Sequence, residues 1–335
     1  MTLKVAVIGA GYWGPNFVRN FIQYPQTDLV SVADLSRQAL NKIKSVYPQV
    51  ETTTDYRPIL DNPNIDLVLI TTPPETHFQI ALEALKKNKH LIVAKPLTLN
   101  SKQASKLLKM AISKNLLLHG DLTYIYTGAV EYIEKFVRQG KLGKVLYYDS
   151  TRANLGLIQK ETSVIWDLVP HDLAILEHCF HLKLKQVFAS ASKHYQNSKN
   201  YEMAHITLTY ENNFIAHIHV SWISPVKLRT ILLGGSRKMI YYNDVEPDEK
   251  IRIYDKGIDI QKEDISYMKP VYRSGDAVIP KLKTEEAIYS EIDQVVKMII
   301  AKKISYRNAL MNSQIIKILE ACDRSVESGK PVVFK

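Results

Sequence analysis

A short apolar run that ends in a glycine-rich turn is the feature that most restricts the fold of this chain. Residues 3–8 are almost all apolar and rich in β-branched side chains, which is typical of a strand buried in a parallel sheet. Gly9, Gly11 and Gly14 follow in a GxGxxG spacing. In such a turn the first glycine allows the tight bend, the second lets a pyrophosphate approach the backbone, and the third lets a helix pack on the strand.

The residues around the turn support a dinucleotide site. An amphipathic stretch at 12–22 follows the glycines, and an apolar strand near 28–33 ends in Asp34. Asp34 lies 20 residues after the last of the three glycines, a spacing at which a carboxylate reaches the ribose hydroxyls of a dinucleotide. Tyr12 and Trp13, inside the turn, are further candidate contacts. A glycine-rich turn without a ligand is the weaker alternative in this context.

Length, charge and cysteine content exclude several classes of protein. A chain of 335 residues is long enough for two domains. No apolar stretch approaches the roughly 18 residues of a membrane span, so we expect a cytoplasmic protein without a membrane partner. Cys179 and Cys322 have neither disulfide nor zinc-ligand spacing, which fits a reducing compartment. The net charge of +10 comes from scattered lysines without a nucleic-acid motif, so we expect no nucleic-acid partner.

The alternation of strand and helix patterns predicts a doubly wound, parallel α/β domain of the Rossmann type over residues 1–120. The helical stretches carry charged side chains on one side and apolar side chains on the other, so they should cover the sheet. Further strands are expected near residues 66–71, 90–94 and 116–118, with helices at 36–47, 75–88 and 101–115.

From residue 121 the pattern changes to longer strands with a period of two, which indicates a large, mostly antiparallel sheet. We therefore expect a second, α+β domain over 121–335 that binds the substrate, with a hairpin turn at Asn212 and Asn213. Its expected helices are 128–139, 284–302 and 305–328, and its expected strands are 144–153, 204–223, 230–235 and 238–244.

Candidate ligand contacts follow two of the parallel strands. Thr71, Pro73 and His77 lie at or just past the end of the expected strand 66–71, and Lys95 with Pro96 follows the expected strand 90–94. Ligands of open α/β sheets bind at the carboxyl ends of strands, so both places are candidates. The proline allows a cis bond that can turn the chain toward the ligand. A surface lysine is the alternative interpretation of Lys95.

The stretch WDLVPHDL carries a candidate base. Asp167 and His171 are four residues apart and share one face if the segment is helical. Pro170 is then expected in the first turn, with Asp167 as the helix cap. The helix dipole favours a neutral imidazole while the carboxylate raises its pKa, so His171 is a candidate base near neutral pH, as hydride removal from an alcohol requires. A capping aspartate beside a partly buried histidine is the more ordinary alternative.

Two other polar groups are weaker candidates. Arg152 and Asn154 share one face of a strand, where they are placed to bind hydroxyls or phosphate, although an ion-paired arginine is equally ordinary. We expect no metal site, because the histidine-containing groups lack metal-ligand spacing. These groups are Glu177, His178 and His181, and His217 with His219.

Together these motifs resemble the Gfo/Idh/MocA family, the relatives of glucose-fructose oxidoreductase and inositol dehydrogenase, over nearly the whole chain. The resemblance implies that the glycine turn and Asp34 hold NAD, since Asp34 would repel the 2′-phosphate of NADP. It places Lys95 near the nicotinamide and makes His171, oriented by Asp167, the proton acceptor. Ala94 stands where the family usually has the glutamate of an EKP motif, which leaves open whether Lys95 or His171 is the base.

Four stretches, GYWGPN, TRANLG, WDLVPHDL and SWISPVK, resemble the branch of the family found with surface-polysaccharide and lipid A sugar synthesis. This implies oxidation of the C3 hydroxyl of UDP-N-acetylglucosamine or its uronic acid to a 3-keto sugar, by a homodimer or homotetramer. The implied substrate contacts are Tyr124, Arg152, Asn154, His171 and Lys227. A dehydrogenase or reductase of a free polyol or sugar, and a non-catalytic dinucleotide-binding regulator, are the alternatives.

Overall fold

The computed structural model describes residues 1–156, 158, 162–195, 200–260 and 270–334, and these residues form two sheets. Contacts within the chain define a first unit, residues 1–127 with 285–317, and a second unit, residues 128–284 with 318–335. A C-terminal segment therefore groups with the N-terminal residues, whereas the sequence predicts a single division at residue 120. That division, into a cofactor-binding and a substrate-binding part, stays a prediction about function.

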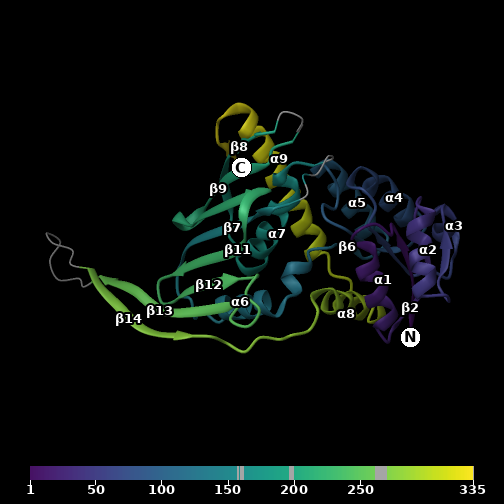
Figure 1. Cartoon of the computed structure of the whole chain (residues 1–335), viewed down its shortest axis with the longest axis horizontal. Helices are drawn as coiled ribbons and strands as arrows, with labels where there is room; N and C mark the ends of the chain where they lie inside the picture. Colours follow the sequence, from purple (N-terminus) through teal and green to yellow (C-terminus); the bar gives the residue numbers. More distant parts are fainter. Residues whose placement is uncertain (157, 159–161, 196–199, 261–269, 335) are drawn as a thin grey trace. The chain divides into compact units, whose positions relative to one another are not determined.

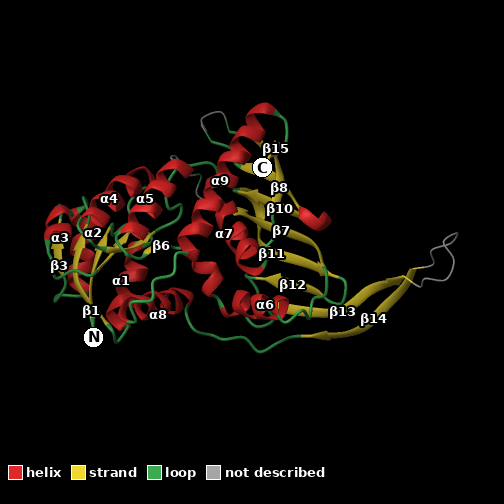
Figure 2. Ribbon diagram, turned by 180° about the vertical axis from the view of Figure 1, so that it is seen from behind, coloured by secondary structure: helices red, strands yellow, loops and turns green. Residues whose placement is uncertain are grey.

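The sheet of the first unit is parallel throughout, as predicted, and its strand order is β3-β2-β1-β4-β5-β6. Figure 2 shows α1 and α8 on one side of this sheet and α4 and α5 on the other. The strands are β1 (Leu3–Ile8), β2 (Thr27–Ala33), β3 (Glu51–Thr53), β4 (Leu67–Ile70), β5 (His90–Val93) and β6 (Leu118–Gly120). The helices are α1 (Gly14–Gln23), α2 (Arg37–Val46), α3 (Arg57–Asp61), α4 (Pro74–Lys86), α5 (Ser101–Ser113), η1 (Thr123–Tyr126), α8 (Ala287–Ile300) and α9 (Arg307–Ser328), the last of which continues into the second unit.

The core of the first unit explains why α8 belongs to it. Apolar residues of β1 and α1, among them Val7 and Phe17, form one buried cluster with Ile292 and Val296 of α8. Burial of such side chains is worth about 1.5–3 kcal/mol each, which offsets the cost of closing the long connection between them. The short β3 and α3, which the sequence did not predict, complete the αβ repeats of this unit.

The sheet of the second unit has the order β14-β13-β12-β11-β7-β10-β9-β8-β15. Its described neighbours are antiparallel except β7 and β10, which confirms a mostly antiparallel sheet. Figure 1 shows β13 and β14 continuing beyond the other strands of this sheet as a two-stranded ribbon. The elements are α6 (Gly128–Arg138), β7 (Val145–Leu155), α7 (Val164–Cys179), β8 (Leu184–Ser192), β9 (Met203–Tyr210), η2 (Glu211–Asn213), β10 (Ile215–Ser221), β11 (Ile223–Gly235), β12 (Met239–Asn243), β13 (Ile251–Ile260), β14 (Pro270–Val278) and β15 (Val332–Val333).

The asparagine turn predicted in the second unit forms where the sequence places it. Asn212 and Asn213 have φ values of 62° and 59°, the left-handed region that asparagine tolerates in turns, and they connect β9 to β10. Cys179 and Cys322 are buried free thiols. In the part of the chain that the structure describes, no helix combines the length and apolar content that a bilayer crossing requires.

Candidate active site

The glycine turn after β1 has no room for a side chain at two of its three glycines. Gly9 has a φ of +106°, and a Cβ added there would lie 2.6 Å from the carbonyl carbon of Thr71, so no other residue fits without movement. A Cβ at Gly14 would clash with the Gly9 carbonyl oxygen, whereas one at Gly11 would meet nothing within 4 Å. The open space at Gly11, beside the first turn of α1, fits the pyrophosphate of a dinucleotide.

Asp34 is held next to the glycine turn by backbone groups. Its Oδ2 accepts a hydrogen bond from the N–H of Ala10 at 2.6 Å, and its Oδ1 accepts from the N–H of Ser36 at 2.7 Å. Each carboxylate oxygen keeps a second lone pair, so Asp34 can still accept from ribose hydroxyls. The residues of the turn and of β2 therefore fit NAD as the sequence predicts.

The other predicted cofactor residues lie at the carboxyl ends of β4 and β5. Thr71 joins β4 to the turn, since its hydroxyl donates to the Gly9 carbonyl at 2.7 Å. Pro73 is exposed and directly precedes α4. Lys95 is half-buried after β5, and its peptide bond to Pro96 is cis.

His77 connects the two loops that follow β4 and β5. Its ring is fully buried, with Nδ1 2.9 Å from the carbonyl oxygen of Pro96 and Nε2 2.7 Å from that of Thr72. Burial lowers the pKa of His77, so the ring is neutral and donates to only one of these two oxygens. His77 therefore holds the two loops together; a contact of His77 with the cofactor stays a prediction.

Helix α7 begins earlier than the sequence predicts. It starts at Val164 after Ser163, so Asp167 lies within the first turn and does not cap the helix. Pro170 lies inside the helix, which corrects its expected place in the first turn. The buried side chains of the first turn, including Trp166, compensate for the hydrogen bond that a proline cannot donate. His171 is consequently too far along the helix for the expected dipole effect, which acts within the first turn.

Asp167 and His171 still share one face of α7, as their spacing predicts. The indole Nε1 of Trp222 donates to Asp167 Oδ2 at 3.1 Å, and the Trp222 side chain is buried. Trp222 was missed as a site residue in the sequence, where the SWISPVK stretch that contains it contributed only to the family resemblance. It fixes one oxygen of the carboxylate that is expected to orient His171.

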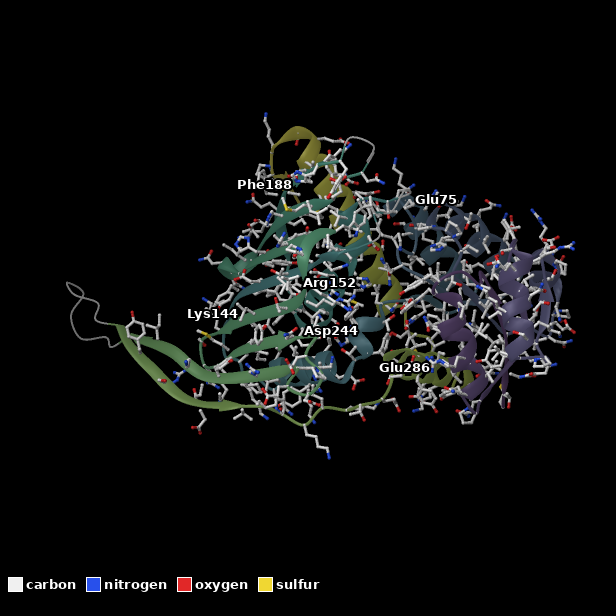
Figure 3. All side chains as sticks on the ribbon, viewed as in Figure 1. Glu75, Lys144, Arg152, Phe188, Asp244 and Glu286 are labelled. Carbon is white, nitrogen blue, oxygen red and sulfur yellow. The ribbon has the colours of Figure 1, made fainter. Side chains whose placement is uncertain are left out.

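Arg152 is buried between β7 and α7. Its Nε donates to Asp172 Oδ2 at 2.9 Å and its Nη2 to Oδ1 at 3.3 Å, while both side chains are under 5% exposed, at 4% and 2%. Figure 3 labels Arg152 within the second unit. The arrangement is the ion-paired alternative considered above, and it anchors the helix residue next to His171. A substrate contact of Arg152 stays a prediction.

The remaining predicted positions differ in exposure. Asn154 is half-buried on the same strand as Arg152, and Lys227 is exposed at an irregularity of β11. Tyr124 is half-buried in η1 of the first unit, and Tyr12 is 94% exposed in the glycine turn. Exposure leaves Tyr12 and Lys227 available to a ligand, and their roles stay predictions.

The histidine-rich stretches are not arranged as metal sites. No group of three or more histidine, cysteine, aspartate or glutamate side chains could hold a metal ion within the residues described. His219 instead stacks on His205, with ring centroids 4.3 Å apart. Glu177 accepts a hydrogen bond from the Tyr210 hydroxyl at 3.2 Å, and burial raises the pKa of Glu177 to about 7.

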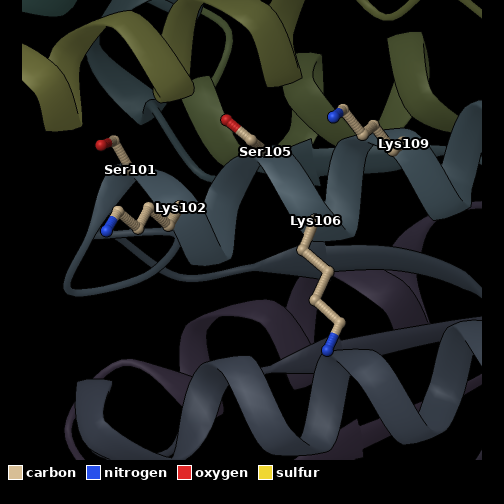
Figure 4. A pocket seen from close by; sticks show the side chains of 5 residues that line it. All are labelled: Ser101, Lys102, Ser105, Lys106 and Lys109. Carbon is tan, nitrogen blue, oxygen red and sulfur yellow. The ribbon is translucent and has the colours of Figure 1, made fainter.

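A hollow on the surface of α5 is lined by serine and lysine side chains. Figure 4 shows these residues on a single helix: Ser101, Lys102, Ser105, Lys106 and Lys109. The ammonium group of Lys106 lies 5.7 Å from the ring centroid of Phe78, so part of this row covers an aromatic side chain. This is the charged outer side that the sequence predicts for a helix covering the sheet.

The parallel sheet, its glycine turn and Asp34 define a dinucleotide-binding α/β domain. Residues 3–121 match the model of an oxidoreductase family with an NAD-binding Rossmann fold, and residues 130–241 match the C-terminal domain of the same Gfo/Idh/MocA family. The chain therefore belongs to the Gfo/Idh/MocA family of NAD-binding oxidoreductases, which confirms the resemblance of its motifs.

Three similar proteins illustrate the range of this family. An uncharacterized oxidoreductase, YdgJ of Escherichia coli, is 26% identical over 98% of this chain and 96% of its own. The scyllo-inositol 2-dehydrogenase (NADP+) IolW of Bacillus subtilis is 24% identical over 70% of this chain and 63% of its own. The structure of the UDP-N-acetylglucosamine 3-dehydrogenase GnnA of Acidithiobacillus ferrooxidans superposes with a TM-score of 0.82 at 20% identity, covering 98% of this chain and 99% of that one.

Proposed function

We propose that this protein is an NAD-dependent dehydrogenase that oxidises the C3 hydroxyl of a UDP-linked N-acetylated sugar, UDP-N-acetylglucosamine or its uronic acid, to the 3-keto sugar. The observation that carries the proposal is the placement of Asp167 and His171 on one face of α7, with an Asp167 oxygen held by Trp222. A carboxylate fixed near an imidazole orients the ring and supports its protonated form.

In the proposed reaction His171 accepts the proton of the sugar hydroxyl. Asp167 stabilises the imidazolium that forms, and its bond from Trp222 keeps the carboxylate from turning away. The ammonium group of Lys95 is assigned to the developing alkoxide, where a positive charge lowers the barrier. NAD bound at the glycine turn supplies the hydride acceptor. Lys95 as the base in place of His171 is the other assignment.

Two observations support a nucleotide sugar as the substrate. The fold matches that of a UDP-N-acetylglucosamine 3-dehydrogenase over nearly the whole of both chains. The net charge of +10 attracts a diphosphate-linked ligand. Tyr124, Asn154 and Lys227 are the proposed substrate contacts, with Arg152 as a fourth whose guanidinium is already paired with Asp172.

A dehydrogenase of a free polyol is the second candidate. The sequence similarity to a scyllo-inositol 2-dehydrogenase over 70% of this chain favours it. A polyol enzyme needs no site for uridine diphosphate, whereas the proposed enzyme does. UDP without a sugar should therefore stabilise the proposed enzyme and leave a polyol dehydrogenase unchanged, which separates the two candidates.

A thermal-unfolding screen tests the proposal. The protein is heated with NAD and, in turn, UDP, UDP-N-acetylglucosamine, its uronic acid, myo-inositol and glucose. A ligand at 100 times its dissociation constant stabilises a protein by about 2.7 kcal/mol, so a true ligand raises the unfolding midpoint measurably. We expect a rise with UDP and the UDP-sugars. A rise with inositol or glucose and none with UDP would favour the polyol enzyme.

We further propose a cytoplasmic homodimer or homotetramer, in line with the resemblance of the motifs. Light scattering coupled to size-exclusion chromatography measures the mass directly against the 38.3 kDa of one chain. A mass of two or four chains is expected, and a mass of one chain would contradict this part of the proposal.

A further inference from the structure

A hydrogen bond fixes the aromatic residue of the glycine turn. The indole Nε1 of Trp13 donates to Asp121 Oδ2 at 2.6 Å. The Trp13 ring also packs edge-on against Phe17 of α1, with centroids 6.4 Å apart. The Trp13 carbonyl accepts from the N–H of Asn16 at 3.1 Å, so this same residue begins the helix. The direction of the indole and the start of α1 are therefore set together.

Asp121 reaches this indole from the edge strand of the sheet. It follows β6, which is three strands from β1 in the strand order, and its N–H donates to the carbonyl of Val93 at the end of β5. Asp121 is 2% exposed, and its Oδ1 accepts from the N–H of Thr123 at 3.0 Å and from the Thr123 hydroxyl. The Trp13–Asp121 bond thus links the glycine turn to the carboxyl ends of β5 and β6.

A second carboxyl group completes the surroundings of Asp121. Glu291 of α8 is fully buried and lies beside Asp121. Burial, and after it the neighbouring Asp121, raise the pKa of Glu291 well above its usual value. Glu291 is therefore held in its neutral form.

The other side of Glu291 meets a neutral histidine. His119 Nε2 lies 2.9 Å from Glu291 Oε1, and burial lowers the pKa of His119 to about 3. The Tyr126 hydroxyl and the Asn308 amide also lie within 3.3 Å of His119 Nε2. Three donor groups converge on the Asp121 carboxyl group: Trp13 Nε1, the Thr123 N–H and the Thr123 hydroxyl.

We propose that Asp121 is a positioning residue for NAD, which holds the indole of Trp13 and thereby fixes the backbone N–H groups of the glycine turn, as far as Gly14, that receive the pyrophosphate. The inference rests on NAD binding at this turn and adds a residue that neither the GxGxxG spacing nor Asp34 indicates. A turn that is ordered before the cofactor arrives loses less entropy on binding. Asp121 therefore acts on affinity for the cofactor, through Trp13, without touching it.

The test measures NADH binding to the whole protein by the fluorescence of the nicotinamide, with no sugar present. The variants are Asp121→Asn, Trp13→Phe and the double variant. The Asp121 carboxylate has two oxygens that accept hydrogen bonds, whereas asparagine has one. Phenylalanine at position 13 keeps the packing on Phe17 but has no side-chain N–H to donate. The matched control is Asp293→Asn, which removes a carboxylate of α8 that accepts from the hydroxyl of Tyr24, just after α1, at 2.8 Å.

We expect each single variant to raise the dissociation constant of NADH about tenfold, and the double variant to be no weaker than the singles. The control stays within twofold of the parent. Adenosine lacks the pyrophosphate, so its inhibition constant against NADH stays unchanged, whereas a general loosening of the first unit would weaken both ligands. Unchanged NADH binding in the single variants, or effects that multiply in the double variant, would overturn the proposal.

Two further arms keep the outcome decisive. Trp13→Phe alone decides the matter if Asp121→Asn does not fold by circular dichroism. Glu291→Gln keeps a neutral side chain of similar shape beside Asp121, so its NADH affinity stays within twofold of the parent, and a tenfold loss would overturn the assignment of a neutral Glu291. Failure of the parent protein to bind NADH would refute the cofactor itself, which is a different result from equal binding by parent and variants.

Discussion

The glycine turn of the first unit and helix α7 of the second unit hold their polar groups by different means. In the turn, Gly9 and Gly14 leave out side chains, and backbone N–H groups hold Asp34. On α7, buried pairs of side chains fix the polar groups, as the ion pair of Arg152 with Asp172 shows. The turn should therefore lose stability or cofactor binding when a side-chain atom is added. Helix α7 should lose stability when one partner of a buried pair is removed.

The largest effect is expected at His171 of α7. Replacing it with asparagine removes the proposed proton acceptor, so kcat should fall by about 10²–10⁴-fold, the usual contribution of a general base. Initial rates of NADH formation with UDP-N-acetylglucosamine measure this, and NADH binding should not change. His181→Asn, at an exposed position just beyond the same helix, is the matched control. A rate within a few fold of the parent would show that the proposed role of His171 is wrong.

Breaking the Arg152–Asp172 pair should cost the most stability. Arg152→Met leaves Asp172 buried without its partner, and such a change lowers the free energy of unfolding by about 3–5 kcal/mol. Urea unfolding of the single variant and of Arg152→Met with Asp172→Leu checks the reason. The double variant should recover most of the loss, because it buries no charge. Equal losses in both variants would mean that packing, not charge, holds α7.

Glu177 of α7 should make stability depend on pH. Burial raises the pKa of Glu177 to about 7 from a usual 4.5, so the folded state binds the proton more tightly than the unfolded state. The stabilisation is complete below about pH 4.5 and is lost as pH rises through 7, with a total near 3 kcal/mol. Urea unfolding at pH 5 and pH 8 measures it. Glu177→Gln should flatten the profile, and an unchanged slope would contradict the assignment.

Adding a methyl group should separate two glycines of the turn. Gly9→Ala forces a positive φ on alanine and a clash with Thr71, so it should lower the free energy of unfolding by about 1–3 kcal/mol. Gly11→Ala meets no atom of the chain and should leave stability within about 0.5 kcal/mol, yet weaken NADH binding. Thermal unfolding and an NADH titration measure both effects. Unimpaired NADH binding by Gly11→Ala would place the pyrophosphate elsewhere.

The sequence predicted the turn better than the helix because the turn is a local feature. The spacing of three glycines and the strand before Asp34 lie within one αβ repeat, and all of them form as expected. The predicted start of α7 was wrong. A proline usually lies in the first turn of a helix, and only the burial of the residues before Pro170 shows that α7 starts at Val164.

Contacts between distant residues were outside the reach of the sequence. Trp222 donates to Asp167 across 55 residues, and Trp13 donates to Asp121 across 108. Helix α8 packs beside α1 although the two helices are far apart in the sequence, and residues 285–317 therefore belong to the first unit. Spacing rules describe neighbours along one helix or strand, so such partners become visible only when the chain is folded.

Transfer of deuterium from C3 of the sugar to the nicotinamide tests the central claim most directly. UDP-N-acetylglucosamine and its uronic acid, each labelled with deuterium at C3, are incubated in turn with the protein and NAD, and the NADH is examined by mass spectrometry. The account predicts NADH that carries one deuterium, and a slower rate than with unlabelled sugar. NADH that forms without deuterium, or no NADH with either sugar, would contradict oxidation at C3.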